Sequence, residues 1–210
     1  WLIPPLATPL VVKNFDVSYA YNRQFKRNPI IQSDELLNHK IGLGYTYNIK
    51  SRPIEPFKNI IKSKSKWWAL LKDFNVNLLP ANFTFRTDLN KIMNETLVRN
   101  VTDGPVTIQP TYYKNFTWTR LYETRWELTR SLSFSYRATN NSRIDEPYGR
   151  IDNSAKKDSL WNGIWSFGRN TYYSQDFSAS YSLPLQKLPL VDWTNLRLQY
   201  GATYSWTAAS

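Results

Sequence analysis

A strict alternation of large apolar and polar side chains across residues 115–139 constrains this fold more than any other feature of the chain. From 116 to 128 every second residue is apolar or aromatic, with Arg120 and Thr124 as exceptions, and most residues between them are charged or hydroxylated. The pattern pauses at 129–131 and resumes with Leu132. A period of two predicts strands with side chains on opposite faces, and so short a pause predicts a hairpin.

Similar alternation recurs along the chain and predicts about seven strands, most of them about 10–13 residues long. The other strands are expected at 13–23, 39–49, 73–91, 173–183 and 196–206. Within 73–91 the apolar register slips at Pro80, which predicts a bulge or a bend there. Strands of soluble proteins usually have about 5–6 residues, whereas a tilted strand that crosses a bilayer needs about 9–11. The lengths therefore favour an all-β fold, an antiparallel transmembrane β-barrel segment that takes up residues 1–210.

The connections between the expected strands fall alternately into two sets. One set is short, apolar or helical, and comprises 50–73, the turn at 129–131 and the proline-bearing stretch 183–193. The other set is long and polar, and comprises 24–38, 92–111 and 140–171. Transmembrane barrels carry long loops on the outer side and short turns on the periplasmic side. Residues 140–171 are therefore expected to form a long outer-side loop without regular structure through most of its length.

Residues 56–71 differ from the rest of the chain because their apolar side chains recur at helical spacing, with lysines between them. We expect one short amphipathic helix there, on the periplasmic side. It either packs on the end of the sheet or lies in a membrane interface, with Trp and Lys as anchors. Residues 1–10 are interrupted by prolines and are expected to be irregular. We expect the chain to be a segment of a longer one.

The two faces of the strands have different expected environments. In a soluble sheet the aromatic face would form the core, whereas in a membrane barrel it meets lipid and the polar face lines the lumen. The barrel interpretation places six charged side chains in the lumen: Glu123, Arg125, Glu127, Arg137, Asp176 and Arg197. It places nine aromatic ones against lipid, some of them as ordinary bulk and some in interfacial girdles: Phe116, Trp118, Tyr122, Trp126, Phe134, Tyr136, Tyr181, Tyr204 and Trp206.

Composition argues against several function classes. There is no cysteine and only one histidine, His39, so disulfides and thiolate sites are excluded and histidine metal sites nearly so. The net charge of +11 permits anionic lipid, acidic or nucleic-acid partners, but rings and charges on opposite faces do not make a base-stacking platform. Glu123 and Glu127 lie about 13 Å apart on one strand, farther than the roughly 5–9.5 Å of paired glycosidase carboxylates. We expect no enzyme, no cofactor, no metal and no nucleic-acid partner.

Several strings resemble one family. The string KDFNVNLLPANFTFRTDLN at 72–90, followed by ETLVRN at 95–100, resembles a repeated signature of the SprA/Sov family. Similar strings are LTRSLSFSYRATNNSRIDEPYGRID at 128–152, SFGRNTYYSQDFSASYSLPLQKLPLVDWTNLR at 166–197 and IEPFKNIIKSKSKWWALLKDF at 54–74. Together they cover most of the chain after about residue 40. These proteins are giant outer-membrane translocons of the Bacteroidetes type IX secretion system, which is also needed for gliding motility.

The resemblance implies a fragment of a much larger single-chain barrel in the bacterial outer membrane. It implies passage of folded cargo proteins, with a PorV-type barrel protein, a plug protein and a peptidyl-prolyl isomerase as partners. Two alternatives stay open: a soluble β-domain that binds glycan or protein through its aromatic face, and a general porin. The family-like outer loop either folds over or into the lumen, or packs on its neighbours through pairs such as Arg143 with Asp145. Its candidate residues are Asn140, Arg143, Asp145, Glu146, Pro147, Gly168 and Arg169.

Overall fold

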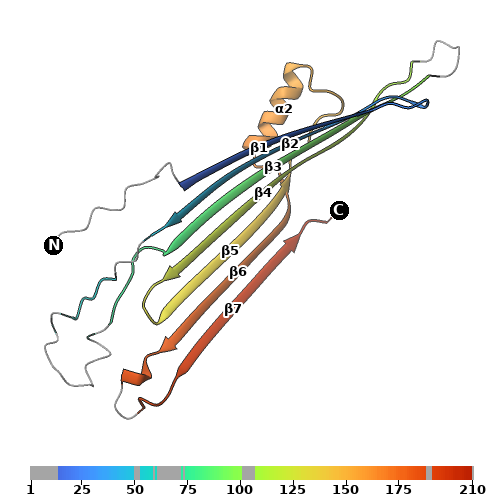
Figure 1. The fold of residues 1–210 in the computed structure, drawn as a ribbon. Coiled ribbons are helices and arrows are strands. Elements are labelled where there is room, and N and C mark those ends of the chain that lie inside the picture. Colours follow the sequence, from blue (N-terminus) through green and yellow to red (C-terminus); the bar gives the residue numbers. More distant parts are fainter. Residues whose placement is uncertain are drawn as a thin grey trace.

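One antiparallel sheet organises the described part of the chain (Figure 1). The computed structural model describes residues 14–49, 53–58, 60, 72, 74–100, 107–187 and 191–209. Within these residues the predicted all-β class is confirmed, and the sheet is accompanied by a short helix, α2 (Ser154–Trp165), which is not the helix predicted at 56–71. Seven strands pair there in chain order: β1 Phe15–Lys26, β2 Ile31–Asn48, β3 Asn82–Val98, β4 Thr111–Glu127, β5 Leu132–Arg143, β6 Arg169–Leu183 and β7 Leu196–Thr207.

The register of the sheet keeps like side chains on the same face. Tyr122 lies opposite Ala138, and Glu123 lies opposite Arg137, which in turn lies opposite Asp176. Opposed residues of antiparallel strands project to the same side, so the alternation of each strand adds up across the sheet. The apolar face is hereafter the side that carries Tyr122 and Ala138, and the polar face is the side that carries Glu123, Arg137 and Asp176.

The predicted hairpin at 115–139 is confirmed, with a turn over residues 128–131. The backbone N–H of Thr129 donates to the Leu132 carbonyl at 3.1 Å, and the Thr129 hydroxyl accepts from the Leu132 N–H at 2.9 Å. Part of the β2–β3 connection packs against the end of β4 at this turn. The Asn77 amide donates to the Glu127 carbonyl and the Trp126 indole donates to the Asn77 carbonyl, both at 2.8 Å. The turn is therefore tied to a distant segment of the chain.

Two of the predicted long loops are wrong because the strands extend into them. β1 and β2 join through residues 27–30 instead of 24–38, and β3 and β4 join through residues 99–110 instead of 92–111. The extended ends contain polar residues at both parities, such as Gln32-Ser33-Asp34-Glu35 in β2. Period-two alternation needs one apolar face, so it disappears where both faces are polar although the backbone ladder continues. The expected contrast between long outer and short inner connections is correspondingly weaker.

The strand predicted at 73–91 begins too early. β3 starts at Asn82, and Val76 makes only an isolated bridge with Ile54. The bend expected at Pro80 is confirmed, because the chain bends at Leu79 and Ala81, just before the strand starts. Irregular pairing occurs between Ile31 and Ser33 and between Asn141 and Ser142. The predicted helix at 56–71 lies mostly outside the described residues, and its first residues, 56–58, form a turn. The stretch at 1–10, predicted to be irregular, lies entirely outside the described residues.

The region predicted as an irregular loop at 140–171 contains regular structure. β5 runs to Arg143, β6 begins at Arg169, and α2 lies between them beside the upper part of the sheet in Figure 1. The Asn153 side chain caps α2 by accepting a hydrogen bond from the Lys156 N–H at 2.9 Å. The helix buries none of its residues fully, so its sequence has no strong apolar periodicity to predict it.

A pair of left-handed residues ends α2 and turns the chain into β6. Phe167 and Gly168 have φ of 62° and 68°, and the Gly168 N–H donates to the Gly163 carbonyl at 3.0 Å. A Cβ on Gly168 would lie 2.9 Å from the Arg143 carbonyl oxygen. Both the backbone angle and the close approach therefore require glycine at this position.

Candidate functional site

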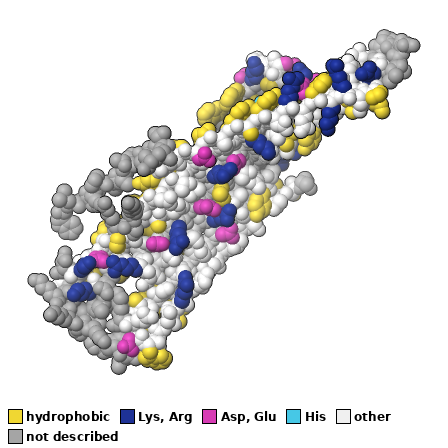
Figure 2. All heavy atoms as spheres, in the orientation of Figure 1, with side chains coloured by type: hydrophobic (Ala, Val, Ile, Leu, Met, Phe, Trp, Pro, Cys, Tyr) yellow, Lys and Arg dark blue, Asp and Glu magenta, His cyan; other side chains and the backbone are white. Residues whose placement is uncertain are grey.

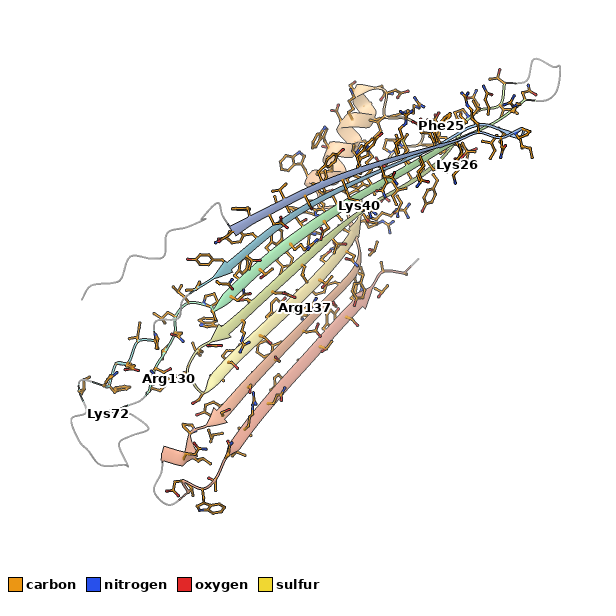
Figure 3. The ribbon with its side chains drawn as sticks, in the orientation of Figure 1. Phe25, Lys26, Lys40, Lys72, Arg130 and Arg137 are labelled. Carbon is orange, nitrogen blue, oxygen red and sulfur yellow. The ribbon has the colours of Figure 1, made fainter. Side chains whose placement is uncertain are left out.

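The polar face carries all six side chains predicted to line a lumen. The register aligns Glu123 with Arg137 and Asp176, while Arg125, Glu127 and Arg197 lie opposite serines of neighbouring strands. Figure 2 shows charged side chains of both signs interspersed across the middle of the sheet, and Figure 3 places Arg137 there and Arg130 at the lower end. The sequence pattern therefore assigned these six residues to one surface correctly.

Charges on the polar face are largely paired with one another. Arg137 lies 3.0 Å from Glu123, Arg86 lies 2.8 Å from Asp88, and Arg125 lies 3.4 Å from Glu127. Such exposed pairs contribute only about 0–1 kcal/mol each to stability, because water screens them. Their larger effect is on the surface itself, since local neutralisation leaves no extended patch of one sign along these pairs.

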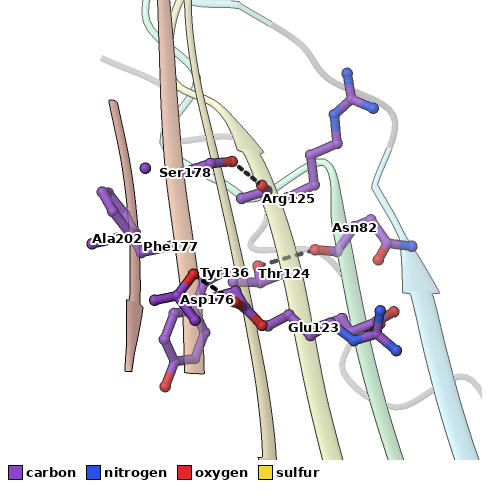
Figure 4. Close-up of a pocket in the computed structure, with 13 residues that line it drawn as sticks. Asn82, Glu123, Thr124, Arg125, Tyr136, Asp176, Phe177, Ser178 and Ala202 are labelled. Carbon is purple, nitrogen blue, oxygen red and sulfur yellow. Dashed lines mark hydrogen bonds and ion pairs between the residues drawn. The ribbon is translucent and has the colours of Figure 1, made fainter. Parts of the chain in front are cut away.

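Small polar groups fill the space around these pairs. Thr203 donates to Asp176 at 2.9 Å, Arg197 donates to Ser180 at 3.0 Å, and the hydroxyls of Ser135 and Ser178 lie 2.6 Å apart. Together with Glu123 and Arg137, several of these side chains line a shallow hollow of about 560 Å³ that opens to solvent (Figure 4). The hollow contains no deep apolar cleft of the kind that holds a small-molecule ligand. The polar face of the described strands is thus a broad hydrophilic surface.

The apolar face has a wide exposed band of large side chains, hereafter the apolar band. Val17 is 69% exposed and Tyr200 is 63% exposed, although both belong to strands. From Leu196 to Trp206 the band extends about 33 Å along the strand, at about 3.3 Å per residue. At the tilt of about 40° usual in barrels this is about 25 Å of height, the size of a lipid-facing belt. Its members include Phe15, Val17, Tyr19, Tyr21, Ile41, Phe83, Tyr122, Trp126, Phe177, Tyr181, Leu198, Tyr200, Tyr204 and Trp206, and the half-buried Phe134 and Tyr136 lie among them on the same face.

Phe116 and Trp118 are on the predicted face, but their prediction as lipid-facing is wrong. Phe116 is only 7% exposed, and the Trp118 ring stacks on Phe167 with centroids 5.4 Å apart. Both are covered by residues 144–168, hereafter the docked segment. Ile144 is 1% exposed and its N–H donates to the Phe116 carbonyl at 2.9 Å. The segment thus packs on the apolar face and not on the polar face.

Ion pairs fasten the upper part of the docked segment to the sheet. Lys91 and Glu146 form an ion pair at 2.7 Å that lacks hydrogen-bond geometry. The Glu146 side chain is 2% exposed. The Lys114 ammonium donates to the Pro147 carbonyl at 2.9 Å. Arg150 pairs with Glu95. The expected contact between Arg143 and Asp145 is present at 3.9 Å, with Arg169 closer to the same carboxylate at 3.4 Å. Of the two arrangements predicted for this loop, the one in which it packs on its neighbours is therefore the one present.

Arg120 holds the lower part of the segment and was not singled out as a site residue. Its guanidinium lies 5.1 Å from the Trp118 ring centroid and 5.3 Å from that of Phe167, although Arg120 is only 8% exposed. One terminal nitrogen lies within 3.1–3.4 Å of four acceptors: the side chains of Asn140, Ser142 and Asn170 and the Phe167 carbonyl. The sequence signal for this role was a cation placed directly between the aromatic residues Trp118 and Tyr122 in its row of β4.

Neither a metal site nor a spanning helix occurs among the described residues. They contain no group of three or more acidic or histidine side chains placed to bind a metal, and no helix long and apolar enough to cross a membrane. No protein-family model matches the chain, and no curated protein sequence matches it.

Proposed function

We propose that this chain is a wall segment of an outer-membrane channel that exports folded cargo proteins by type IX secretion. The observation that carries the proposal is the apolar band, which stays exposed across the described sheet while the opposite face is polar. A monomeric soluble protein rarely exposes an apolar patch of more than a few hundred Å². Lipid removes that cost on one side, and a water-filled lumen accommodates the other.

The backbone supports the same proposal. β1 and β7 are edge strands whose twelve residues are all exposed, so each presents a row of unpaired backbone groups on its outer edge. Soluble proteins shorten, charge or cover such edges. In a bilayer every backbone group needs a partner, and only closure of the sheet supplies one. Both edges are thus suited to pairing with further strands of a larger barrel.

The polar face suits passage of protein better than retention of it. Several of its ionic groups pair with one another, as Arg137 does with Glu123, while Asp176 and Arg197 bond to hydroxyls of neighbouring strands. A passing protein surface finds few unsatisfied charges there and no apolar patch to bind. The mechanism is therefore passive at this wall, and gating belongs to partners: a PorV-type barrel protein, a plug protein and a peptidyl-prolyl isomerase, as the SprA/Sov resemblance implies.

A crosslinking experiment on two adjacent residues tests this function. Phe177 and Ser178 are consecutive in β6 and project to the apolar and polar faces respectively. A photoreactive amino acid is introduced at either position in the full-length protein in cells that secrete cargo. We expect crosslinks to secreted cargo from position 178 and not from 177.

The two alternatives give different outcomes in the same cells. A general porin wall would yield no cargo crosslink from either position. A soluble domain that binds glycan or protein through its aromatic face would leave the membrane without detergent, and position 177 would then be the one that crosslinks a partner. Either result would overturn the proposal.

A further inference from the structure

The outer surface of α2 carries two largely exposed tryptophans. Trp161 and Trp165 are 54% and 77% exposed, and their spacing of four residues places them on one side of the helix. The opposite side of the helix faces Ile144, whose side chain lies 3.1 Å from the place that a Cβ on Gly163 would take. The side of α2 that carries both tryptophans therefore points away from this contact.

The C-terminal end of α2, which carries these rings, adjoins the apolar face of the sheet. Phe167 follows the helix, stacks on Trp118 at 5.4 Å and is itself 55% exposed. Trp118 belongs to the apolar face, two residues along β4 from Arg120 and four from the band member Tyr122. The C-terminal end of α2 thus lies next to the upper margin of the apolar band.

The opposite end of α2 is polar. Lys156 donates to the Arg150 carbonyl at 2.9 Å, and Arg150 pairs with Glu95 near the upper end of β3. Lys157 and Asp158 are exposed in the first half of the helix. The helix therefore descends from a charged end among polar strand tips to an aromatic end beside the apolar band. This gradient matches the change from headgroup region to acyl chains at a membrane surface.

We infer that α2 is an interfacial anchor that inserts Trp161 and Trp165 into the outer leaflet, at the level of the lipid headgroups. The inference rests on the proposed function, because it takes the apolar band to be the surface that meets lipid. Indole rings favour this depth, since they combine a large apolar body with one N–H donor. An anchor here would hold the docked segment down on the outside of the wall and leave the lumen clear.

Site-directed fluorescence quenching tests the anchor. The chain has no cysteine, so a single introduced cysteine can carry a bimane label within it. The full-length protein, with any other cysteines replaced, is reconstituted in phosphatidylcholine nanodiscs that contain lipids brominated either near the headgroup or near the chain end. Labelled variants are Trp165→Cys on α2, Tyr200→Cys in the apolar band and Ser178→Cys on the polar face.

The expected pattern separates the anchor from the wall. The label at 165 should lose fluorescence with headgroup-proximal bromines more than with chain-end bromines, the label at 200 should be quenched by lipid, and the label at 178 only by aqueous iodide. Quenching at 200 without any at 165 would overturn the anchor and leave the proposed function standing. Shielding of 165 from both lipid and iodide would show a protein partner instead of lipid. Absence of lipid quenching at 200 would refute the proposed function itself.

Discussion

Replacement of Arg120 by methionine should release the lower part of the docked segment from the sheet. Methionine keeps most of the volume between Trp118 and Phe167 and keeps a favourable sulfur–ring contact, so the change isolates the charge and its hydrogen bonds. The terminal nitrogen of Arg120 has four acceptors within 3.1–3.4 Å but carries only two hydrogens, so it satisfies two of them at a time.

The loss can be estimated from those two bonds. Hydrogen bonds to a charged group contribute about 1.5–3 kcal/mol each, so the local opening free energy should fall by about 3 kcal/mol. That corresponds to exchange about two orders of magnitude faster for amides that exchange through this opening. Hydrogen exchange with mass spectrometry on peptides covering residues 163–170 measures it. Arg120→Lys, which keeps the charge but not the planar fork, should give an intermediate rate.

The matched control is Arg125→Met, five residues along the same strand on the polar face. Arg125 has a side chain 66% exposed and pairs with Glu127 at 3.4 Å, so its loss should change exchange by about twofold or less. If Arg120→Met and Arg125→Met have the same small effect on residues 163–170, the guanidinium does not hold the segment. The stacked rings and the ion pairs above them would then account for docking.

Two further perturbations test particular contacts. Gly168→Ala should weaken the end of α2 by about 1–2 kcal/mol, because alanine is disfavoured at positive φ, and hydrogen exchange of residues 163–170 should become faster. The control Gly201→Ala, whose new Cβ has nothing within 4 Å, should leave this exchange unchanged. Equal effects of the two variants would refute the steric argument. The pKa of Glu55 is held below its ordinary value, mainly by its hydrogen bond with Lys58 and less by Arg130. Because the folded-state pKa is depressed, these contacts persist above the ordinary carboxylate pKa and are lost as pH falls through the lowered one. In a carboxyl-carbon NMR titration Lys58→Gln should raise the Glu55 pKa more than Arg130→Gln does, and the opposite order would contradict this assignment.

The sequence predicted the faces of the sheet well because each face has its own chemistry. Where one side of a strand is apolar, as from Phe134 to Ala138 in β5, alternation determines both the strand and its orientation. All six charged candidates consequently fell on one face and all nine aromatic ones on the other. The strand ends were not predictable in this way, since β2 continues through Asp34 and Glu35 with polar groups on both sides.

The docked segment was the larger failure of prediction, and its cause is energetic. α2 is a helix without a fully buried side chain, so it lacks the apolar periodicity by which helices are recognised. It is held instead by contacts at its flanks, such as Glu146 with Lys91, that join residues far apart in the sequence. Such pairings depend on the strand register and cannot be inferred from either stretch alone. Arg120 did leave a trace, as a cation between Trp118 and Tyr122 in its row of β4.

The antiparallel order of the described strands limits the number of strands that a closed barrel containing them can have. Antiparallel neighbours reverse direction at every step, so β1 and β7, the first and seventh strands in the order, point the same way. If these seven described strands curled until their edges met, β1 and β7 would have to pair in parallel, which an all-antiparallel barrel does not allow. An even-stranded barrel that contains this sheet must therefore supply an odd number of additional strands. In a barrel of that kind, strand direction alone would make these seven described strands an incomplete set, whatever the chemistry of their faces.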